Sequence, residues 1–258
     1  MKLLKELYAY REMIFSLVRR DLKGRYKGSV LGFLWTFINP LLQLLVYTFA
    51  FSIVMKNDIE DYYLFLFVAL VPWIFFSTSL VGGAECIWSQ KEIVKKIYFP
   101  RQVLPIAFVT SQFINMLLSF LVIFAVLLVT GKGINVLTIL ILPLVMLVEY
   151  IIALGVALIS SAVTVYLRDI ENILAIIAMA GQFTCPIIYN LDIVPENIVK
   201  VINLNPMTPI IIAYRDILYY QRIPESGTLV QALIFGLLIL FIGFIIFSKL
   251  EKHFAEEM

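Results

Sequence analysis

The feature that most constrains this chain is an uncharged run of 26 residues, from Val30 to Met55, that begins where a basic segment ends. A helix needs about 20 apolar residues to cross the hydrocarbon core of a membrane. Each Arg or Lys would cost about 2.5 to 3.5 kcal/mol at the centre of such a helix. The basic segment, residues 19–29, must therefore stay in water or among lipid headgroups. The junction predicts a spanning helix whose start is anchored at one face of a membrane.

The rest of the chain is also poor in charge. Of its 258 residues, 62% are hydrophobic and 15% are charged, whereas soluble domains have about 25% charged residues. Five further runs, uncharged except for Glu149, are long enough to span: 62–84, 103–130, 134–167, 172–191 and 228–248. With a first span at 30–55, they predict an all-α integral membrane protein with six transmembrane helices. We divide the chain into an interface arm, 1–29, and one transmembrane domain, 30–258.

Lys and Arg are distributed unevenly between the two faces of this six-span arrangement. Fifteen of the 20 lie in the arm, in the loop 85–102, at Arg168 and in the C-terminal tail, and five lie on the opposite side. Because Lys and Arg are enriched in cytoplasmic loops, we expect both termini in the cytoplasm. The net charge of +2 is too small to indicate a nucleic-acid partner.

Three segments outside the spans have unusual patterns. Apolar residues recur at helical spacing in the arm, which predicts an amphipathic helix in the membrane interface. The cytoplasmic loop 85–101 has the same character and is stopped by Pro100, so we expect a second interfacial helix there. The external segment 192–227 is too interrupted to span and too apolar for a plain loop. We expect two short re-entrant helices in it, broken at 205–209.

The residue types of a catalytic or metal site are missing from the sequence. The single histidine, His253, lies in a charged tail, and Cys86 and Cys185 show neither disulfide nor metal spacing. Residues 131–133, Gly-Lys-Gly, lack the G-x-x-x-x-G-K-[ST] pattern of a phosphate-binding loop and are interpreted as an external turn. We therefore expect no enzyme activity, metal or cofactor in this chain.

Polar and aromatic side chains share single helical faces inside three spans. These sets are Trp35, Asn39, Gln43 and Tyr47 in the first span; Phe108, Gln112, Asn115 and Ser119 in the third; and Asn172, Met179, Gln182, Phe183 and Tyr189 in the fifth. For the first and fifth spans we favour a channel wall, because amides exchange hydrogen bonds with hydroxyls and rings stack on sugars. An ion path would instead need charged rings or ordered carbonyls. For the third-span set we favour hydrogen bonds between helices.

The expected channel-lining residues cover only part of a pore. They are Trp35, Asn39, Gln43, Tyr47, Gln182, Phe183 and Tyr189. Four-residue steps advance about 40° each, so the first stripe covers a sector of about 120°. One subunit would supply half a pore, and a twofold homodimer would close it.

The fourth span has two features of its own. Its single charge, Glu149, is a functional candidate by its position inside the membrane. A protonated or hydrogen-bonded glutamate that faces a wet cavity or a neighbouring helix is the alternative, and the role of Glu149 stays open. Ala153, Ala157 and Ser161 form a face of small residues, which predicts close helix packing.

Five motifs follow one another along the chain: Arg20-Asp21-Leu22-Lys23-Gly24-Arg25-Tyr26, Lys95-Lys96-Ile97-Tyr98-Phe99-Pro100-Arg101, Tyr166-Leu167-Arg168-Asp169-Ile170, Pro186-Ile187-Ile188-Tyr189 and Asn205-Pro206-Met207-Thr208. In this order they resemble the ABC-2 type permeases that export polysaccharides, most closely the Wzm-type O-antigen and TarG-type teichoic acid permeases. The resemblance covers nearly the whole chain. It implies a homodimer in the bacterial plasma (inner) membrane, bound to two copies of a separate ATPase that holds ATP and Mg. It also implies a coupling helix at 85–101 and external gate helices at 192–227.

A chain without its own phosphate loop must receive force from that ATPase through its cytoplasmic helices. The basic amphipathic helix that ends at Pro100 is the best-placed docking surface, with the arm beside it. The residues expected to couple to the ATPase are Arg20, Asp21, Arg25, Lys91, Lys95, Lys96, Tyr98 and Arg101. The expected cargo is a lipid-linked polysaccharide, moved outward from the cytoplasm.

Two other functions remain as alternatives. An ABC-2 exporter of small molecules or drugs is one, and only the aromatic faces speak against it. A secondary transporter or channel that works alone is the other. Such transporters usually show two similar halves and a midplane ion site, whereas this chain has no internal repeat and only Glu149 as an intramembrane charge.

Overall fold

The computed structural model describes residues 2–24, 28–54, 59–131, 133 and 135–258, and its secondary structure there is helical, without strands. The helices are α1 (Lys2–Ala9), α2 (Arg11–Gly24), α3 (Trp35–Thr48), α4 (Tyr62–Glu85), α5 (Lys91–Lys96), α6 (Val103–Val129), α7 (Val136–Ile139), α8 (Leu142–Tyr166), α9 (Ile170–Thr184), α10 (Glu196–Ile202), α11 (Met207–Leu218), α12 (Ser226–Leu250) and α13 (Phe254–Glu257). The predicted all-α class is confirmed for the described residues.

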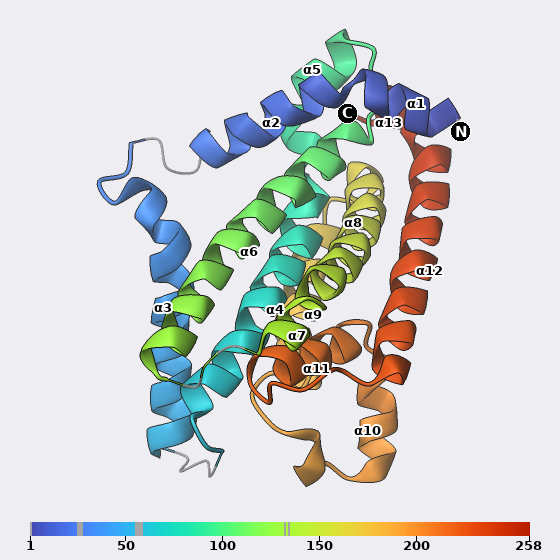
Figure 1. The fold of residues 1–258 in the computed structure, drawn as a ribbon. Coiled ribbons are helices and arrows are strands. Elements are labelled where there is room, and N and C mark those ends of the chain that lie inside the picture. Colours follow the sequence, from blue (N-terminus) through green and yellow to red (C-terminus); the bar gives the residue numbers. More distant parts are fainter. Residues whose placement is uncertain (1, 25–27, 55–58, 132, 134) are drawn as a thin grey trace.

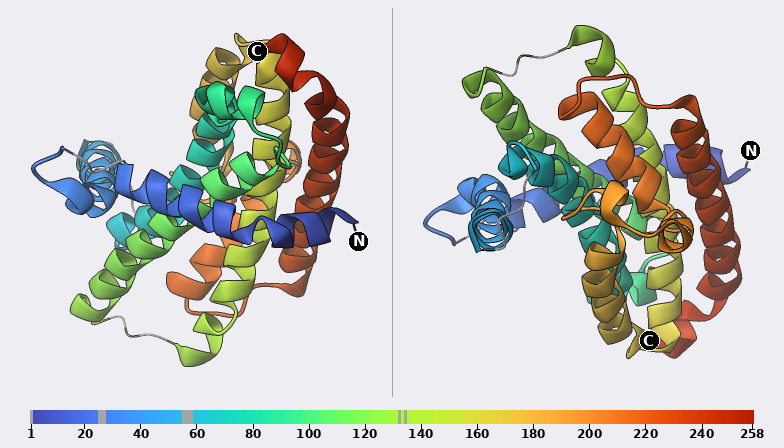
Figure 2. Two further views of the ribbon diagram at one scale, coloured as in Figure 1. Left: turned by 90° about the horizontal axis from the view of Figure 1, so that it is seen from above. Right: turned by 90° about the horizontal axis from the view of Figure 1, so that it is seen from below.

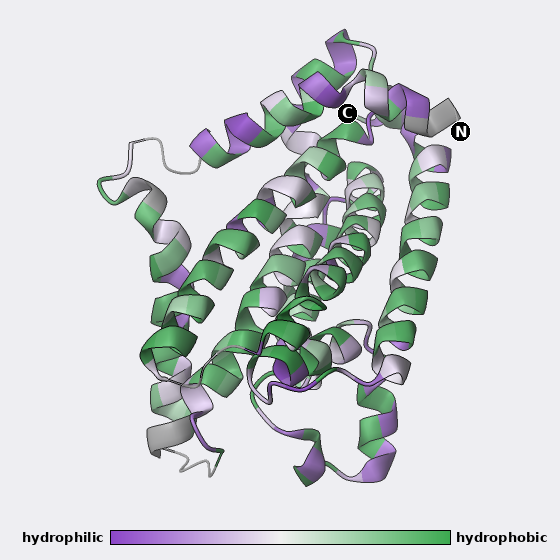
Figure 3. Ribbon diagram, in the orientation of Figure 1, coloured by the Kyte–Doolittle hydropathy of each residue, from purple (hydrophilic) through white to green (hydrophobic). Residues whose placement is uncertain are grey.

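The long helices run between two polar ends of the molecule. Helices α1, α2, α5 and both chain termini lie at one end, and α10 and α11 lie at the other (Figure 1). Hydrophilic residues gather at these two ends, and hydrophobic residues line the helices between them (Figure 3). Four helical segments are long and apolar enough to cross a membrane: Tyr62–Glu85, Val103–Val129, Val136–Tyr166 and Ser226–His253. The apolar helices Trp35–Phe51 and Ile170–Thr184 are shorter.

Helix α8 lies at the centre and packs against both α4 and α12. The predicted face of small residues makes this possible, because Ala153, Ala157 and Ser161 are all 0% exposed. On the other side of α8, a Cβ atom added at Gly243 of α12 would lie 2.6 Å from the carbonyl oxygen of Gly155. The two backbones therefore touch, as small residues at helix interfaces permit.

The predicted fifth span differs from the helix that is observed. Helix α9 ends at Thr184, whereas the uncharged run extends to residue 191. Cys185 is extended, with φ −100° and ψ 143°. It precedes Pro186, whose ring disfavours the helical conformation in the residue before it. The proline, rather than the end of the apolar run, ends the helix.

The predicted first and fourth spans are also divided. Helix α3 is preceded by a 3₁₀ turn at Gly32–Leu34 and continues into a π-helical segment, Phe49–Val54. Met55, the end of the predicted span, lies outside the described residues. The run 134–167 forms the short α7 and then α8, which begins beside Pro143 in its first turn, a position where proline fits a helix.

The segment 85–101, predicted as one cytoplasmic helix, contains a shorter and more irregular helix. It consists of a 3₁₀ turn at Trp88–Gln90 followed by α5, and Ile97 is extended. Phe99, next to Pro100, is 4% exposed. Burial of this ring and the proline after it hold the chain extended before α6 begins.

The arm forms two helices instead of one, separated at Tyr10. Helix α2 packs across α6, with Val18 buried between them. Viewed along the bundle, α1 and α2 cross over the ends of the long helices (left view of Figure 2). This placement agrees with an amphipathic element at the edge of the apolar band.

The segment predicted to be external contains α10 and α11, joined by residues 203–206. The predicted break, 205–209, overlaps this junction, but α11 already begins at Met207. The Oδ1 atom of Asn205 accepts a hydrogen bond from the backbone N–H of Met207 at 3.0 Å, so it satisfies a free donor of the first turn of α11. The hydroxyl of Thr208 donates to the carbonyl of Ile202 at 2.7 Å. Most of α11 is buried against α4, α8 and α12, whereas α10 is mainly exposed.

Candidate functional site

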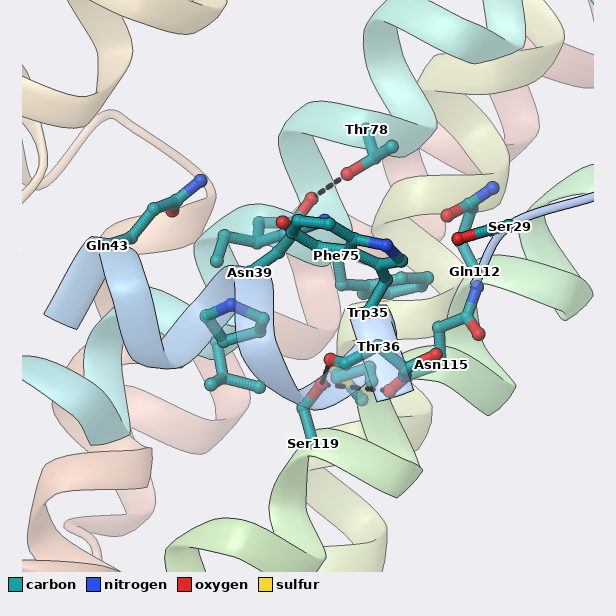
Figure 4. Close-up of a pocket in the computed structure, with 14 residues that line it drawn as sticks. Ser29, Trp35, Thr36, Asn39, Gln43, Phe75, Thr78, Gln112, Asn115 and Ser119 are labelled. Carbon is teal, nitrogen blue, oxygen red and sulfur yellow. Dashed lines mark hydrogen bonds between the residues drawn. The ribbon is translucent and has the colours of Figure 1, made fainter. Parts of the chain in front are cut away.

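Three of the four first-span stripe residues line a cavity. Trp35, Asn39 and Gln43 of α3 face a space of about 690 Å³ between α3, α4 and α6, here called the α3–α6 cavity (Figure 4). Thr78 and Phe75 of α4 form another wall. The cavity lies around the middle of the bundle, because its lining extends over residues 71–78 of α4 and 112–119 of α6.

The third-span set faces the same cavity. Gln112, Asn115 and Ser119 of α6 all line it. The hydroxyl of Ser119 lies 3.5 Å from the carbonyl oxygen of Thr36 on α3, so the predicted hydrogen bond between helices applies to this residue. The Nε2 atom of Gln112 and the Oδ1 atom of Asn115 are buried and have no hydrogen-bond partner among the described residues. For these two amides, hydrogen bonding between helices stays a prediction, with one atom of each amide lacking a described partner.

The two predicted channel stripes meet at one hydrogen bond. Nε2 of Gln182 on α9 donates to the hydroxyl oxygen of Tyr47 on α3 at 2.8 Å. Phe183, the next residue of α9, is 58% exposed. Tyr189 lies beyond the end of α9 and so does not continue this helical face.

Glu149 is buried against α11. Its side chain is 0% exposed, and its Oε2 atom accepts a hydrogen bond of 2.6 Å from the hydroxyl of Tyr214 on α11. Its Oε1 atom has no partner among the described residues. Of the two interpretations, the structure supports a hydrogen-bonded glutamate that faces a neighbouring helix.

Next to Tyr214 is a buried charge that sequence reasoning missed. Arg215 is 4% exposed, and its guanidinium donates to the carbonyls of Ile187, at 2.6 Å, and Tyr189, at 3.3 Å. It also lies 3.5 Å from the centre of the Phe65 ring. The signal was an arginine directly after the apolar stretch of α11. Arg215 ties the turn after α9 to α4 and α11.

Four of the five predicted coupling residues of the loop line one cavity at the end of the molecule that bears α1 and α5. Lys95, Lys96, Tyr98 and Arg101 surround a space of about 630 Å³ that also includes Glu6 of α1. The Tyr98 side chain is 95% exposed. The loop and the arm therefore form one surface at this end of the molecule.

The Arg101 side chain is bound within this chain, whereas the sequence predicts that it contacts the ATPase. Its guanidinium donates a hydrogen bond to the carbonyl of Glu251 and lies 5.7 Å from the centre of the Phe254 ring. It therefore holds the C-terminal end of α12 against the loop. Of the remaining predicted residues, Lys96 is exposed and pairs with Glu92 at 3.0 Å. The hydrogen bond from Lys96 lowers the pKa of Glu92.

The predicted arm residues lie at a second, smaller cavity. Arg20 and Asp21 line a space of about 170 Å³ with Glu85 and Ser89. Asp21 accepts a hydrogen bond from the hydroxyl of Ser111 on α6. Arg25 lies outside the described residues.

The ring of Trp88 contacts two cationic side chains, one in the turn before α9 and one at the start of α5. The guanidinium of Arg168 lies 3.5 Å from the centre of its ring, and the ammonium of Lys91 lies 5.5 Å from it. Arg168 belongs to the third motif and Lys91 to the predicted coupling set, so this ring joins the two regions. In the part of the chain that the structure describes, no group of three His, Cys, Asp or Glu side chains could hold a metal ion.

Comparison with known proteins gives matches along the whole chain. Residues 12–219 match the family described as ABC-2 type transporter. An O-antigen export system permease protein RfbA of Myxococcus xanthus is 35% identical, over 100% of this chain and 99% of that protein. An RfbA of Klebsiella pneumoniae is 31% identical over 95% and 94%. The polysialic acid transport protein KpsM of Escherichia coli is 24% identical over 92% and 93%.

Both the family match and the full-length relatives agree with the motifs and with the apolar helical bundle. Four helical segments are long and apolar enough to cross a membrane, and two shorter apolar helices accompany them. The chain belongs to the ABC-2 type transporter family and is a multi-pass membrane protein.

Proposed function

We propose that this chain is the permease subunit of an ATP-driven exporter that moves a lipid-linked polysaccharide outward across the bacterial plasma membrane. The observation that carries the proposal is the similarity, over nearly all of both chains, to proteins named O-antigen export permeases. A more distant relative is named for polysialic acid transport. The chain is the transport subunit, and a separate subunit binds ATP and Mg and hydrolyses the nucleotide.

Six crossings are the topology that best fits the fold. The proposed spans are α3 with its π-helical extension, α4, α6, α8, α9 and α12. Residues 35–54 would rise about 30 Å and α9 about 22 Å at 1.5 Å per residue, so α9 alone is too short for the hydrocarbon core. The turn after it, held by Arg215, would complete the crossing. Both termini lie at one end of the bundle, as an even number of crossings requires (Figure 1). The basic residues at that end support a cytoplasmic location.

The channel of this exporter is proposed to form between two copies of the chain. The bond between Tyr47 and Gln182 places α3 and α9 side by side as one wall. Large apolar side chains are exposed on both helices, among them Leu45 and Phe49 on α3 and Ile176 and Met179 on α9. A twofold partner would cover this surface and supply the opposite wall.

Each copy would receive force from one ATPase at the end that bears α1, α2 and α5. Two neighbouring cavities there are lined by the predicted coupling residues Lys95, Lys96 and Tyr98, and by Arg20 and Asp21. Arg101 contributes by fixing the loop to α12 rather than by direct contact.

Deleting the gene in its host tests the proposal. Loss of surface polysaccharide, with lipid-linked polymer retained inside the cell and export restored by the wild-type gene, is the expected result. Electrophoresis of extracted polysaccharide and surface labelling with a lectin measure it. Normal surface polysaccharide together with increased drug sensitivity would instead identify a small-molecule exporter.

A further inference from the structure

The α3–α6 cavity contains two buried amides whose hydrogen bonds are incomplete. Gln112 is 4% exposed, and its Nε2 atom has no partner among the described residues. The Oδ1 atom of Asn115, three residues further along α6, is also buried and has no partner among the described residues. Both side chains line the cavity, beside Ser29 in the close-up (Figure 4). Gln112 and Asn115 thus lie one turn apart on one face of α6, and each has one buried amide atom without a described partner.

Leaving such atoms unpaired has a cost in stability, since buried polar groups are normally hydrogen-bonded. Leucine at either position would avoid this cost in an apolar bundle. An amide side chain carries both a donor and an acceptor, so it suits a hydroxyl group, which also donates and accepts. The two amides are therefore arranged for a ligand that carries hydroxyls.

The other walls of the cavity narrow the class of ligand. None of the described residues that line it is charged, and these residues suit a neutral ligand better than an anionic one. Trp35 and Phe75 supply aromatic surface, and Asn39 and Gln43 supply further amides. About 690 Å³ is within the usual range of small-ligand pockets, about 300 to 1,000 Å³, and is far larger than the share of a single water molecule, about 30 Å³.

We infer that each subunit holds one neutral sugar residue of its lipid-linked cargo in the α3–α6 cavity, with a hydroxyl paired to Gln112 and Asn115. This inference rests on the proposed function and adds a recognition site within a single copy of the chain. The site lies near the middle of the membrane in the proposed topology. Helix α3 separates this site from the surface that a second copy would cover. The site therefore binds the sugar outside the path between the subunits.

Binding of defined probes to the full-length chain in lipid nanodiscs tests the site. The probes are a polyprenyl diphosphate that carries N-acetylglucosamine, one that carries galactose, and the same polyprenyl diphosphate without sugar. We expect the double variant Gln112→Leu, Asn115→Leu to bind at least one sugar-bearing probe about tenfold more weakly than wild type, because two hydrogen bonds are lost. Binding of the sugar-free probe should not change. Equal losses for all three probes would mean that the cavity holds the carrier, and no loss would mean that it holds only water; either result overturns the inference.

A melting curve separates recognition from a structural role. Gln112→Leu should keep or raise the melting temperature, because it removes an unpaired buried donor. The matched control is Thr110→Val on the same helix, whose hydroxyl lies 2.8 Å from that of Tyr150 on α8. This control should lower the melting temperature and leave probe binding unchanged. A decrease for Gln112→Leu as large as that for Thr110→Val would overturn the inference.

Export by the same variants distinguishes this inference from the proposed function. The deletion strain complemented with wild type reports on the proposed function. The double variant should restore less surface polysaccharide at equal protein level. Full restoration by the double variant, beside full restoration by wild type, would reject the cavity and retain the exporter.

Discussion

Arg215 shows how one buried side chain can define the end of a helix. Because α9 stops before Pro186, the carbonyls of the following turn need donors from elsewhere, and the guanidinium supplies two of them. It also lies on the face of Phe65. A planar cation with several donors can do both at once, which an ammonium cannot.

Arg215→Lys should therefore loosen this turn while the bundle stays folded. Loss of the bonds to Ile187 and Tyr189 should cost about 1 to 3 kcal/mol, which raises the open population of the turn about 5- to 150-fold. Cys185 is 0% exposed and lies in the turn, so its rate of maleimide labelling reports the opening. Cys86, 8% exposed and outside this turn, is the internal control. An unchanged rate at Cys185 would contradict this role.

The bond between Glu149 and Tyr214 gives a second prediction for single residues. Tyr214→Phe should lower the free energy of unfolding by about 1 to 2 kcal/mol, because it leaves both carboxyl oxygens without a described partner. Glu149→Gln keeps an acceptor for the tyrosine hydroxyl and should cost less. Thermal unfolding in detergent measures both variants and their combination. Equal losses for the two single variants would contradict the expectation that an amide oxygen at position 149 still accepts the hydrogen bond from Tyr214.

At the scale of elements, the cytoplasmic loop and α5 carry the prediction about the ATPase. Reversal of charge at Lys91, Lys95 and Lys96 should reduce transport-coupled ATP hydrolysis several-fold and leave membrane insertion intact, because these side chains are exposed at the proposed docking surface. Hydrolysis by the reconstituted complex is the measurement. Lys200→Glu on α10, at the opposite end of the molecule, is the control and should have no effect. Normal coupling in the triple variant would indicate that the ATPase instead contacts the arm around Asp21.

The sequence predicts some elements far better than others. The bounds of α4, α6 and α12 lie within two residues of the uncharged runs, because charges at both ends limit those helices. The end of α9 could not be found this way, since no charge marks it and a proline inside the run decides it. Likewise, the spacing of Gln112 and Asn115 showed a shared face, but only packing shows that this face lines a cavity rather than a neighbouring helix.

For the whole molecule, the two polar ends predict which residues a membrane-impermeant reagent can reach. A cysteine placed at Asn197, exposed on α10, should be labelled from outside the cell. One placed at Ser89, in the turn before α5, should be labelled only after the membrane is opened. Replacing Cys86 and Cys185 by alanine in both variants removes the background. External labelling at position 89 would refute the proposed six-span topology.

The contact between the backbones of α8 and α12 limits which mutations the gene can tolerate at two glycine codons. At Gly155 and Gly243 the space for a Cβ atom is taken by main-chain atoms of the other helix, 2.7 Å and 2.6 Å away. Any change in the first or second base of these codons adds a side chain. In a library of point mutants selected for export, only silent third-base changes should survive at the two positions. Gly227, where nothing lies within 4 Å of an added Cβ, should accept alanine in the same selection.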